Sequence, residues 1–128
     1  MKVTVIGCGD AFGSGGRFNT CFHVQGEKTC FLIDCGASSL VSLKARYKSL
    51  NDIQTLLVTH FHADHCGGVP FFMIDARFAS RRTRHLTIAG PRGMRDWYER
   101  AMENSFPGSS RSVQRFDLSL IELGPYET

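Results

Sequence analysis

Three histidines and one aspartate, His60, His62, Asp64 and His65, lie within a stretch of six residues. The stretch follows an apolar run at residues 53–58 and precedes a pair of glycines. Imidazole and carboxylate groups together favour zinc, or another borderline ion such as manganese or iron, over the all-oxygen shell of calcium. The stretch therefore predicts a metal site, and the alternative is a chance cluster of polar loop residues.

The spacing of the histidines indicates how they would be presented. Side chains two residues apart in an extended segment point to the same side, so His60 and His62 can converge on one ion. A helical pair of ligands would be spaced four residues apart, as in HExxH. We expect a strand over residues 53–58 to end before the ligands and a loop to hold them. Asp64 and His65 would then diverge from the first pair and suit a second ion.

The segment THFHADHCGG resembles the signature of the metallo-β-lactamase superfamily of hydrolases. The resemblance extends to GCGDAFGSGGRFNTCFHV, FLIDCG and LTIAGPRG, and within the superfamily it is greatest for the ribonuclease Z branch. It implies an α/β fold, the metallo-β-lactamase-like αββα sandwich, with only the N-terminal βα half present. Residues 1–128 would then be the N-terminal half of one such domain.

The resemblance also implies a chemistry. Members of the ribonuclease Z branch bind zinc, two ions per complete site, with manganese or iron as alternatives. The residues of this chain that match their ligands are His60, His62, Asp64 and His65. Two ions would lower the pKa of bound water so that hydroxide attacks at neutral pH, and Asp64 would handle protons of the water or leaving group. No organic cofactor is needed. The implied substrate is a phosphodiester in RNA, as in 3′ processing of a tRNA precursor; other members hydrolyse lactones, thioesters, sulfate esters or small phosphodiesters.

Two further segments match parts of the resembling family. Asp34 ends an apolar strand and matches an aspartate that orients an imidazole of the histidine loop by accepting its other N–H. The alternative is an N-cap for the helix that comes next, and both roles can coexist. The glycine-rich loop after the first strand, with Arg17 and Asn19, borders the active-site cleft in the family. A dinucleotide fingerprint would need glycine in place of Phe12, so that type of site does not fit.

The ligands are too few for a complete site. A catalytic zinc takes about three protein ligands and a water, whereas this chain offers two residues per ion. In the resembling family the others come from segments beyond the position of Thr128, and His23 and His85 are poor substitutes. The open explanations are a truncated hydrolase, half of a site that another chain completes, or a catalytically incomplete metal- or nucleic-acid-binding fragment. One sheet with helices on one side leaves an apolar face, so we expect a homo-oligomer or a missing C-terminal half.

Composition limits the class of protein. A chain of 128 residues with 42% hydrophobic content is long enough for one core. No run approaches the roughly 18 apolar residues that span a bilayer, and a strand pattern begins at Lys2 in place of a signal peptide. We therefore expect a soluble, cytoplasmic protein. Five cysteines without a CxxC pair indicate small buried thiols in a reducing compartment, with Cys66, beside His65, as an alternative soft ligand.

Positive charge is concentrated in one part of the chain. The formal net charge of +3 is mild, but residues 75–100 contain Arg77, Arg81, Arg82, Arg84, Arg92, Arg95 and Arg100. A basic surface beside a metal site would favour a polyanion such as RNA. The alternative is a solvated helix face with no partner, because exposed helices commonly carry arginines.

Periodicity predicts how these residues are positioned. It favours strands over residues 2–7, 20–25, 28–34, 53–58 and 86–89, helices over 38–47, 69–79 and 94–104, and a strand pair or one long strand over 113–123. Ser38 or Ser39 should cap the first helix. The side chains expected to face the core from the helices are Leu40, Val41, Leu43, Phe71, Phe72, Ile74, Phe78, Trp97, Tyr98 and Met102.

Overall fold

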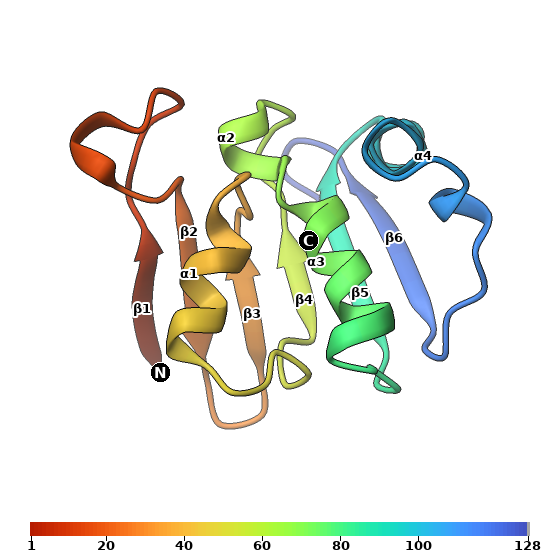
Figure 1. Cartoon of the computed structure of the whole chain (residues 1–128), viewed down its shortest axis with the longest axis horizontal. Helices are drawn as coiled ribbons and strands as arrows, with labels where there is room; N and C mark the ends of the chain where they lie inside the picture. Colours follow the sequence, from red (N-terminus) through yellow and green to blue (C-terminus); the bar gives the residue numbers. More distant parts are fainter. Residues whose placement is uncertain (128) are drawn as a thin grey trace.

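The computed structural model describes residues 1–127, which contain one six-stranded sheet. Its strands are β1 (Lys2–Gly7), β2 (Cys21–Gln25), β3 (Cys30–Ile33), β4 (Thr55–Leu57), β5 (Leu86–Pro91) and β6 (Leu118–Leu123). They lie in space in the same order as in the chain (Figure 1). The pairs β1–β2 and β2–β3 are antiparallel, whereas β3 to β6 run parallel. The parallel half therefore has a common carboxyl edge, at which ligand sites of α/β sheets gather.

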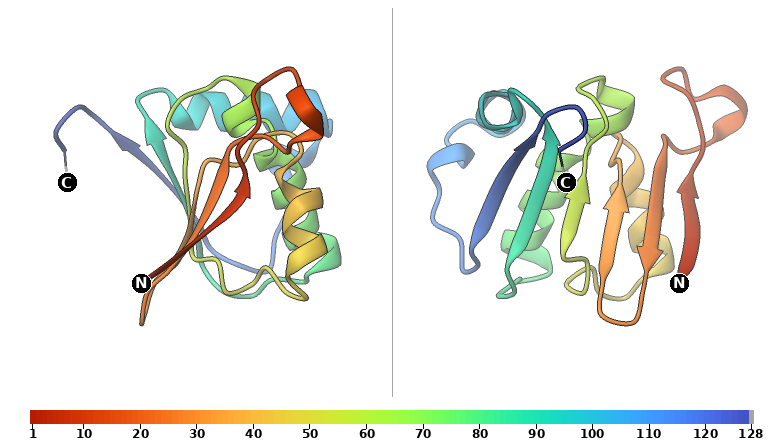
Figure 2. Two further views of the ribbon diagram at one scale, coloured as in Figure 1. Left: turned by 90° about the vertical axis from the view of Figure 1, so that its left-hand side faces the viewer. Right: turned by 180° about the vertical axis from the view of Figure 1, so that it is seen from behind.

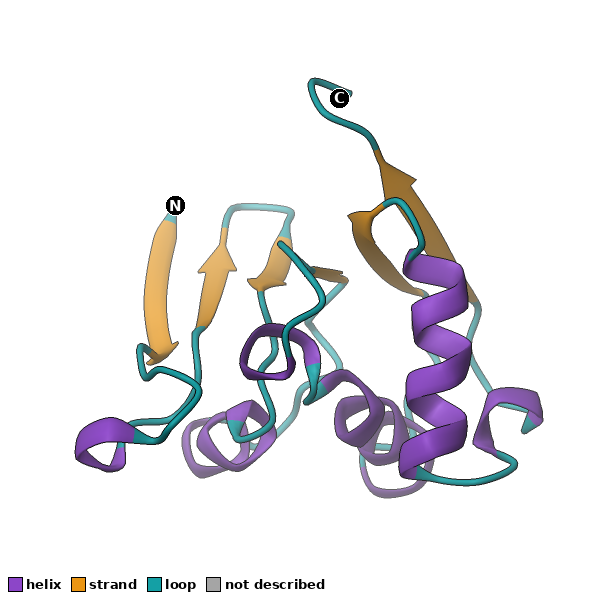
Figure 3. Ribbon diagram, turned by 90° about the horizontal axis from the view of Figure 1, so that it is seen from above, coloured by secondary structure: helices purple, strands orange, loops and turns teal. Residues whose placement is uncertain are grey.

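The helices lie on one face of the sheet (Figures 2 and 3). They are α1 (Ser39–Arg46), α2 (Ala63–Cys66), α3 (Val69–Ile74) and α4 (Met94–Ser105), with a π-helical turn at Asp75–Ala79 and 3-10 turns at Ser14–Gly16 and Ser109–Arg111. Right-handed crossovers that advance in one direction all fall on the same face, which explains the one-sided arrangement. Among the residues described, no helix combines the length and the apolar character needed to cross a membrane.

The two faces of the sheet differ in exposure. On the helix side, Leu32, Leu56 and Ile88 pair across β3, β4 and β5 and are at most 1% exposed. Alternate side chains point to the other face. There, paired residues form an apolar row across all six strands: Val5, Phe22, Ile33, Leu57, Ala89 and Ile121. The edge strands leave this apolar row open to solvent, since Val5 is 51% and Ile121 43% exposed.

The start of α1 differs from the expectation. Neither Ser38 nor Ser39 caps the helix with its side chain. The Ser38 hydroxyl instead donates to Asn19 Oδ1 at 2.9 Å and accepts the Asn19 backbone N–H at 2.9 Å. Ser38 thus joins α1 to the glycine-rich loop. Its hydroxyl is not available as a helix cap because it already bonds to Asn19.

The inner side of α1 also differs from the prediction. Leu43 is buried as expected, but Val41 is 64% exposed. Ser42 takes an inner position and donates its hydroxyl to Ile6 O at 2.7 Å. A serine that bonds to a strand carbonyl satisfies a polar group inside the core, which hydrophobic periodicity cannot reveal.

The predicted helix over residues 69–79 changes its geometry at Asp75. The N–H of Ser80 donates to Asp75 O at 2.8 Å, which is the long bond of a π-helical turn. The additional residue in this turn rotates the later side chains about the helix axis, so Phe78 is 69% exposed and the prediction that it is buried was wrong. Phe72 is buried as predicted, whereas Phe71 is 47% exposed.

The last segment is only partly a strand. α4 covers the predicted helix and buries Tyr98 and Met102. Residues 113–117 were expected to be extended, but β6 begins only at Leu118, where it pairs in parallel with β5. Alternation of apolar residues therefore overstated the strand by several positions.

Candidate metal site

The histidine segment begins where β4 ends, at the carboxyl edge of the parallel strands. His62 is extended, with φ −71° and ψ 139°. Asp64 and His65 were expected in a loop but lie on α2, which is too short to show a period in the sequence. This turn forms because the N–H groups of His65 and Cys66 both donate to His62 O, at 2.9 and 3.0 Å.

Close backbone packing holds α2 against the residues just after β3. A Cβ at Gly36 would lie 2.0 Å from Asp64 O, and a Cβ at Gly68 would lie 2.2 Å from Gly36 O. Contacts this close to backbone atoms leave room only for glycine. Cys35 donates its N–H to His65 O at 2.7 Å in the same region. The peptides that carry the candidate ligands are therefore fixed by contacts with residues far away in sequence.

Three imidazole rings form one group at this edge. The ring centroids of His60 and His62 are 4.8 Å apart, and those of His60 and His65 are 4.2 Å apart. The sequence led us to expect His65 to diverge from the first pair, but its ring is as near to His60 as that of His62. Asp64 Oδ2 lies 3.5 Å from His65 Nε2. All four residues singled out in the sequence are thus gathered in one place.

Asp34 lies behind this group and is 3% exposed. His65 Nδ1 donates to its Oδ2 at 2.7 Å, and the backbone N–H of Thr59 donates to its Oδ1 at 2.8 Å. Asp34 has a φ of 60°, in the left-handed region that a residue other than glycine seldom adopts. Its own N–H donates to Leu57 O at 2.7 Å, which ties the strained residue to the end of β4. The N-cap alternative is wrong, because Ser38 occupies that position of α1.

Thr59 belongs to the same network, and the sequence analysis missed it. Its Oγ1 lies 3.0 Å from both carboxylate oxygens of Asp34 and 3.0 Å from His60 Nδ1. A carboxylate only accepts hydrogen bonds, so the hydroxyl donates to Asp34 and accepts from His60 Nδ1–H. His65 likewise holds its proton on Nδ1, facing Asp34. In the neutral imidazole of both residues, Nδ1 therefore carries the hydrogen and Nε2 is the nitrogen with the free lone pair. The signal in the sequence was a hydroxyl residue placed directly before the first histidine.

These residues fit zinc in their chemistry but form an incomplete set. An imidazole whose Nδ1–H is held by a carboxylate or hydroxyl, with Nε2 free, is the form in which histidine binds zinc. Within residues 1–127, however, no group of three or more His, Cys, Asp or Glu side chains is arranged to hold an ion by itself. A catalytic zinc takes about three protein ligands, so these residues by themselves are fewer than such a site requires.

The cysteines do not join the imidazole group. All five are free, and Cys8 is exposed although the sequence suggested buried thiols. Cys66 is buried and donates its S–H to His62 O at 3.2 Å. Burial raises the pKa of Cys66 to about 12, so the thiol form is favoured. Cys66 is therefore a buried thiol whose hydrogen bond supports the backbone at the start of α2.

The other two histidines lie elsewhere. His23 is buried, with Nδ1 2.8 Å from the Tyr47 hydroxyl and Nε2 3.0 Å from Cys30 Sγ. His85 is exposed and precedes β5, so it lies at the amino edge of the parallel strands, where Nε2 is 2.8 Å from Ser119 Oγ. Each ring has its partners far from the carboxyl edge.

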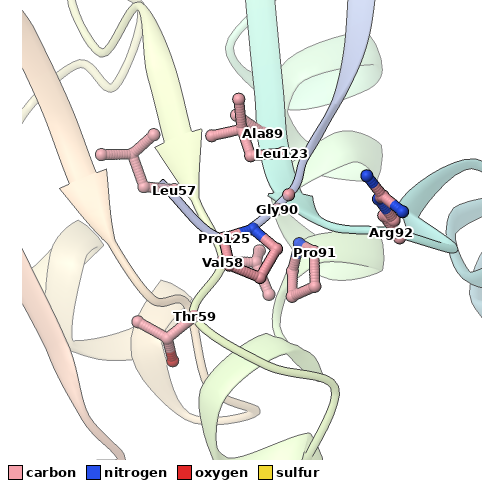
Figure 4. A pocket seen from close by; sticks show the side chains of 10 residues that line it. Leu57, Val58, Thr59, Ala89, Gly90, Pro91, Arg92, Leu123 and Pro125 are labelled. Carbon is pink, nitrogen blue, oxygen red and sulfur yellow. The ribbon is translucent and has the colours of Figure 1, made fainter. Parts of the chain in front are cut away.

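Two cavities flank the histidine segment. One of about 470 Å³ is lined by His62 and Asp64 together with Asn19 of the glycine-rich loop. The other, of about 570 Å³, opens at the carboxyl ends of β4, β5 and β6 and has largely apolar walls (Figure 4). Thr59 and Arg92 border this second cavity (Figure 4). The histidine segment therefore has open space on both sides.

The arginine-rich segment does not form one basic surface beside the histidines. Arg82 is 1% exposed. Its guanidinium donates to the carbonyl oxygens of Arg84, Ile53 and His85 at 2.7 to 2.8 Å. Arg84 pairs with Asp52, away from the site. The expectation of solvated arginines was therefore wrong for Arg82, whose buried guanidinium bonds to carbonyl oxygens just before β4 and β5.

Comparisons with known proteins place these observations in a family. A family model described as anti-Pycsar protein Apyc1 matches residues 1–118. Ribonuclease Z of Clostridium kluyveri is 36% identical over 94 residues, 73% of this chain and 31% of that protein. Zinc phosphodiesterase ELAC protein 1 of Bos taurus is 33% identical over 108 residues, 82% of this chain and 30% of that protein. The chain thus spans less than a third of the length of these two relatives.

Solved structures support the fold. Human tRNase Z, short form, superimposes with a TM-score of 0.80 at 30% identity, over 98% of this chain and 46% of that one. A metallo-β-lactamase fold protein of Bacillus subtilis gives a TM-score of 0.72 at 20% identity over the same shares and shows the fold alone. The predicted fold class is confirmed. The chain therefore belongs to the family described as anti-Pycsar protein Apyc1, as a ribonuclease Z-like relative within the metallo-β-lactamase superfamily.

Proposed function

We propose that the whole protein is a metal-dependent hydrolase that cleaves a phosphodiester. The observation that carries this proposal is the hydrogen bond from His65 Nδ1 to Asp34, together with the equivalent contact between His60 and Thr59. Such bonds to the far nitrogen orient an imidazole and raise its basicity as a ligand. Names such as ribonuclease Z and zinc phosphodiesterase among the relatives support the same chemistry.

His60, His62, Asp64 and His65 are the proposed ligands, and Asp34 is the proposed residue that orients His65. Zinc, two ions in a complete site, with manganese or iron as alternatives, would supply a Lewis acid and lower the pKa of water. Asp64 is the proposed proton acceptor for the attacking water, because its carboxylate lines the cavity of about 470 Å³. A substrate in that cavity would meet His62 and Asp64 on the same wall.

The proposed substrate is RNA, at the 3′ end of a tRNA precursor. The names tRNase Z and ribonuclease Z among the similar proteins support this choice. A lactone, thioester, sulfate ester or small phosphodiester is the alternative substrate class. We also propose a cytoplasmic location, which the free cysteines support because free thiols persist in reducing compartments.

The missing ligands and the cover for the apolar row are proposed to come from one source. That source is the C-terminal half of the domain, with residues 1–128 as the N-terminal half, or a second copy of this chain. The open apolar row favours such a cover, since single-faced sheets bury their apolar side. We predict that the chain self-associates when it is alone, as measured by light scattering. A monodisperse monomer would contradict this prediction.

A second candidate is a binding fragment that holds one ion or a nucleic acid and catalyses nothing. The observation that favours it is the absence, within residues 1–127, of any group of three donors arranged around an ion. Under this alternative the network of Asp34 and Thr59 would still orient the imidazoles, but the ion would be bound weakly.

One experiment separates the two candidates. Zinc bound per chain is measured by plasma mass spectrometry on the whole protein, and cleavage of bis(p-nitrophenyl) phosphate and of a tRNA precursor is measured on the same sample. Two ions with turnover support the hydrolase, one weakly bound ion without turnover supports the binding fragment, and no bound metal refutes both metal proposals. His65→Ala should lower zinc content, whereas the matched control His85→Ala removes an exposed histidine at the opposite edge and should not.

A further inference from the structure

We propose that a cavity at the amino edge of the parallel strands binds single-stranded nucleic acid. The cavity has a volume of about 370 Å³ and lies between the π-helical turn and residues 113–115. We call it the arginine cavity, and it is lined by Arg77, Phe78, Arg81, Val113, Gln114 and Arg115. This inference goes beyond the proposed function, because the arginine cavity would retain a nucleic acid whether or not the chain cleaves it.

Two of the three arginines are free to bind an anion. Arg81 and Arg115 are exposed, and neither side chain has a hydrogen-bond or ion-pair partner within residues 1–127. Arg77 is fixed, since its Nε donates to Gln114 Oε1 at 3.1 Å and its Nη1 to Ser109 O at 2.7 Å. The lining contains no acidic side chain. The two free guanidinium groups can each bind a phosphate bidentately, whereas Arg77, whose Nη1 also donates to Ser112 Oγ at 2.7 Å, adds positive charge beside them.

Apolar side chains beside these cations identify the class of polyanion. Phe78 is 69% and Val113 is 99% exposed, although both are large and hydrophobic. An aromatic ring next to arginines is the arrangement that single-stranded nucleic acids use, because a base stacks on the ring while the phosphates contact the cations. An acidic peptide would engage the charges but would leave the ring unused. The combination therefore favours a nucleic acid.

The backbone around the arginine cavity is held in unusual conformations. Asp75–Ala79 forms a π-helical turn, a feature that is frequent at functional sites. Arg81 has a φ of 45°, in the left-handed region that a residue other than glycine seldom adopts. Asp75, which bonds to Lys44 and Ser80, holds the turn in place. As a result Arg81 is exposed while Arg82, its neighbour in the chain, is buried.

The arginine cavity and the histidines lie at opposite ends of the same helical segment. α3 starts after Gly68, whose N–H bonds to Cys35 O beside the candidate metal site. The other end is tied to the segment before β4, where Asn51 Nδ2 donates to Ser80 O at 2.8 Å. At about 1.5 Å per helical residue, the two places are roughly 15 Å apart. The arginine cavity would therefore anchor a strand of nucleic acid at a distance from the histidines.

The test is binding of a fluorescein-labelled oligouridine of about twelve nucleotides, a typical site size, followed by fluorescence anisotropy in EDTA. The unmodified chain should bind, and Arg81→Asn with Arg115→Gln should weaken binding about tenfold at low salt. Asparagine is chosen because it tolerates a positive φ. Loss of two phosphate contacts should lower the slope of log affinity against log salt by about 1.4. Phe78→Ala should weaken binding without changing that slope.

The matched control is Arg84→Gln with Arg100→Gln, which removes two charges from exposed arginines outside the arginine cavity. It should change affinity by less than about twofold. The proposal is overturned if the unmodified chain does not bind, if the control loses as much affinity, or if polyglutamate competes as well as RNA does. Because EDTA removes metal ions, failure here leaves the hydrolase proposal untouched, and an inactive hydrolase leaves this one untouched.

Discussion

Each edge of the parallel strands contains a buried charged side chain at a strained point of the backbone. At the carboxyl edge, Asp34 has a φ of 60° and accepts hydrogen bonds from His65 and Thr59. At the amino edge, Arg81 has a φ of 45°, and the next residue, Arg82, donates to three backbone carbonyl oxygens. The two edges thus use similar means, a buried charge and an unusual φ, with different partners.

The two edges differ in whether the hydrogen-bond partners of the buried side chain keep an atom that can bind a ligand. The network of Asp34 ends on imidazoles that it contacts through Nδ1, so that Nε2 of each ring is not used by the network. The network of Arg82 ends on backbone carbonyl oxygens, which do not titrate and carry no side-chain group that could react. A buried charge therefore points to a functional site only when its partners keep a reactive atom. By this criterion the carboxyl edge is the candidate site, whereas Arg82 is part of the framework.

Arg82→Met should have the largest effect on stability. The substitution keeps the volume of the side chain but leaves the carbonyl oxygens of Arg84, Ile53 and His85 without their donor. At about 1 kcal/mol for each lost bond, we expect the free energy of unfolding to fall by about 3 kcal/mol in urea denaturation. The matched control Arg84→Met removes an exposed ion pair and should change it by less than about 1 kcal/mol. Stabilisation by Arg82→Met would show that the desolvation of the charge outweighs its bonds.

Among the variants that leave the proposed ligands in place, Asp34→Asn should have the largest effect on metal binding. Asparagine tolerates the positive φ, but it has one oxygen and one NH₂ group. If the oxygen accepts from Thr59, the NH₂ group opposes His65 Nδ1–H, and the proton moves to Nε2. We expect zinc affinity, measured by titration calorimetry, to fall about 10- to 100-fold. Asp52→Asn, which alters an exposed carboxylate at the amino edge, is the control. Equal losses in both variants would refute the orienting role.

Thr59→Val should have a smaller effect at the same edge. Valine matches the shape of threonine but removes the hydroxyl that accepts from His60 Nδ1. The Thr59 backbone N–H still donates to Asp34, so the carboxylate keeps its position. The donation of the hydroxyl to Asp34 is lost as well, but the bond that bears on the ligand is the one to His60. Loss of that hydrogen bond corresponds to about 1 kcal/mol, or about fivefold in zinc affinity by calorimetry. The control Thr55→Val, on β4, should leave the zinc affinity unchanged. If Thr59→Val also left the zinc affinity unchanged, the assignment of the His60 tautomer would be contradicted.

The smallest expected effect is that of His23 on the pH dependence of the free energy of unfolding. Burial lowers the pKa of His23, and the charge of Lys2 lowers it further. Between the folded pKa and the ordinary value near 6.5, the unfolded chain binds more protons, so stability falls as pH falls through this window. His23→Gln should flatten this part of the pH dependence of unfolding in urea, whereas His85→Gln should not. An unchanged dependence in His23→Gln would show that another group causes it.

The regular elements could be predicted from local patterns, and their exceptions could not. β1, β2, β3 and α4 follow the alternation or helical period of their apolar residues. α2 escaped prediction because four residues cannot display a period. Phe78 was misplaced because a π-helical turn changes the helical repeat, and the sequence carries no local sign of that turn. Arg82 was misplaced because its partners are backbone carbonyls, which every sequence contains.

The sequence by itself determined which candidate metal ligands are available and where along the chain they occur, because His60, His62, Asp64 and His65 follow a recognisable pattern. Tertiary structure alone decided which atom of each ring is free. Asp34 meets His65 across 31 positions of sequence, and the peptides between them are held by glycine contacts that admit no side chain. Hydrogen bonds are short and directional, so only the packed fold can select the nitrogen that carries the proton and leave the other one open.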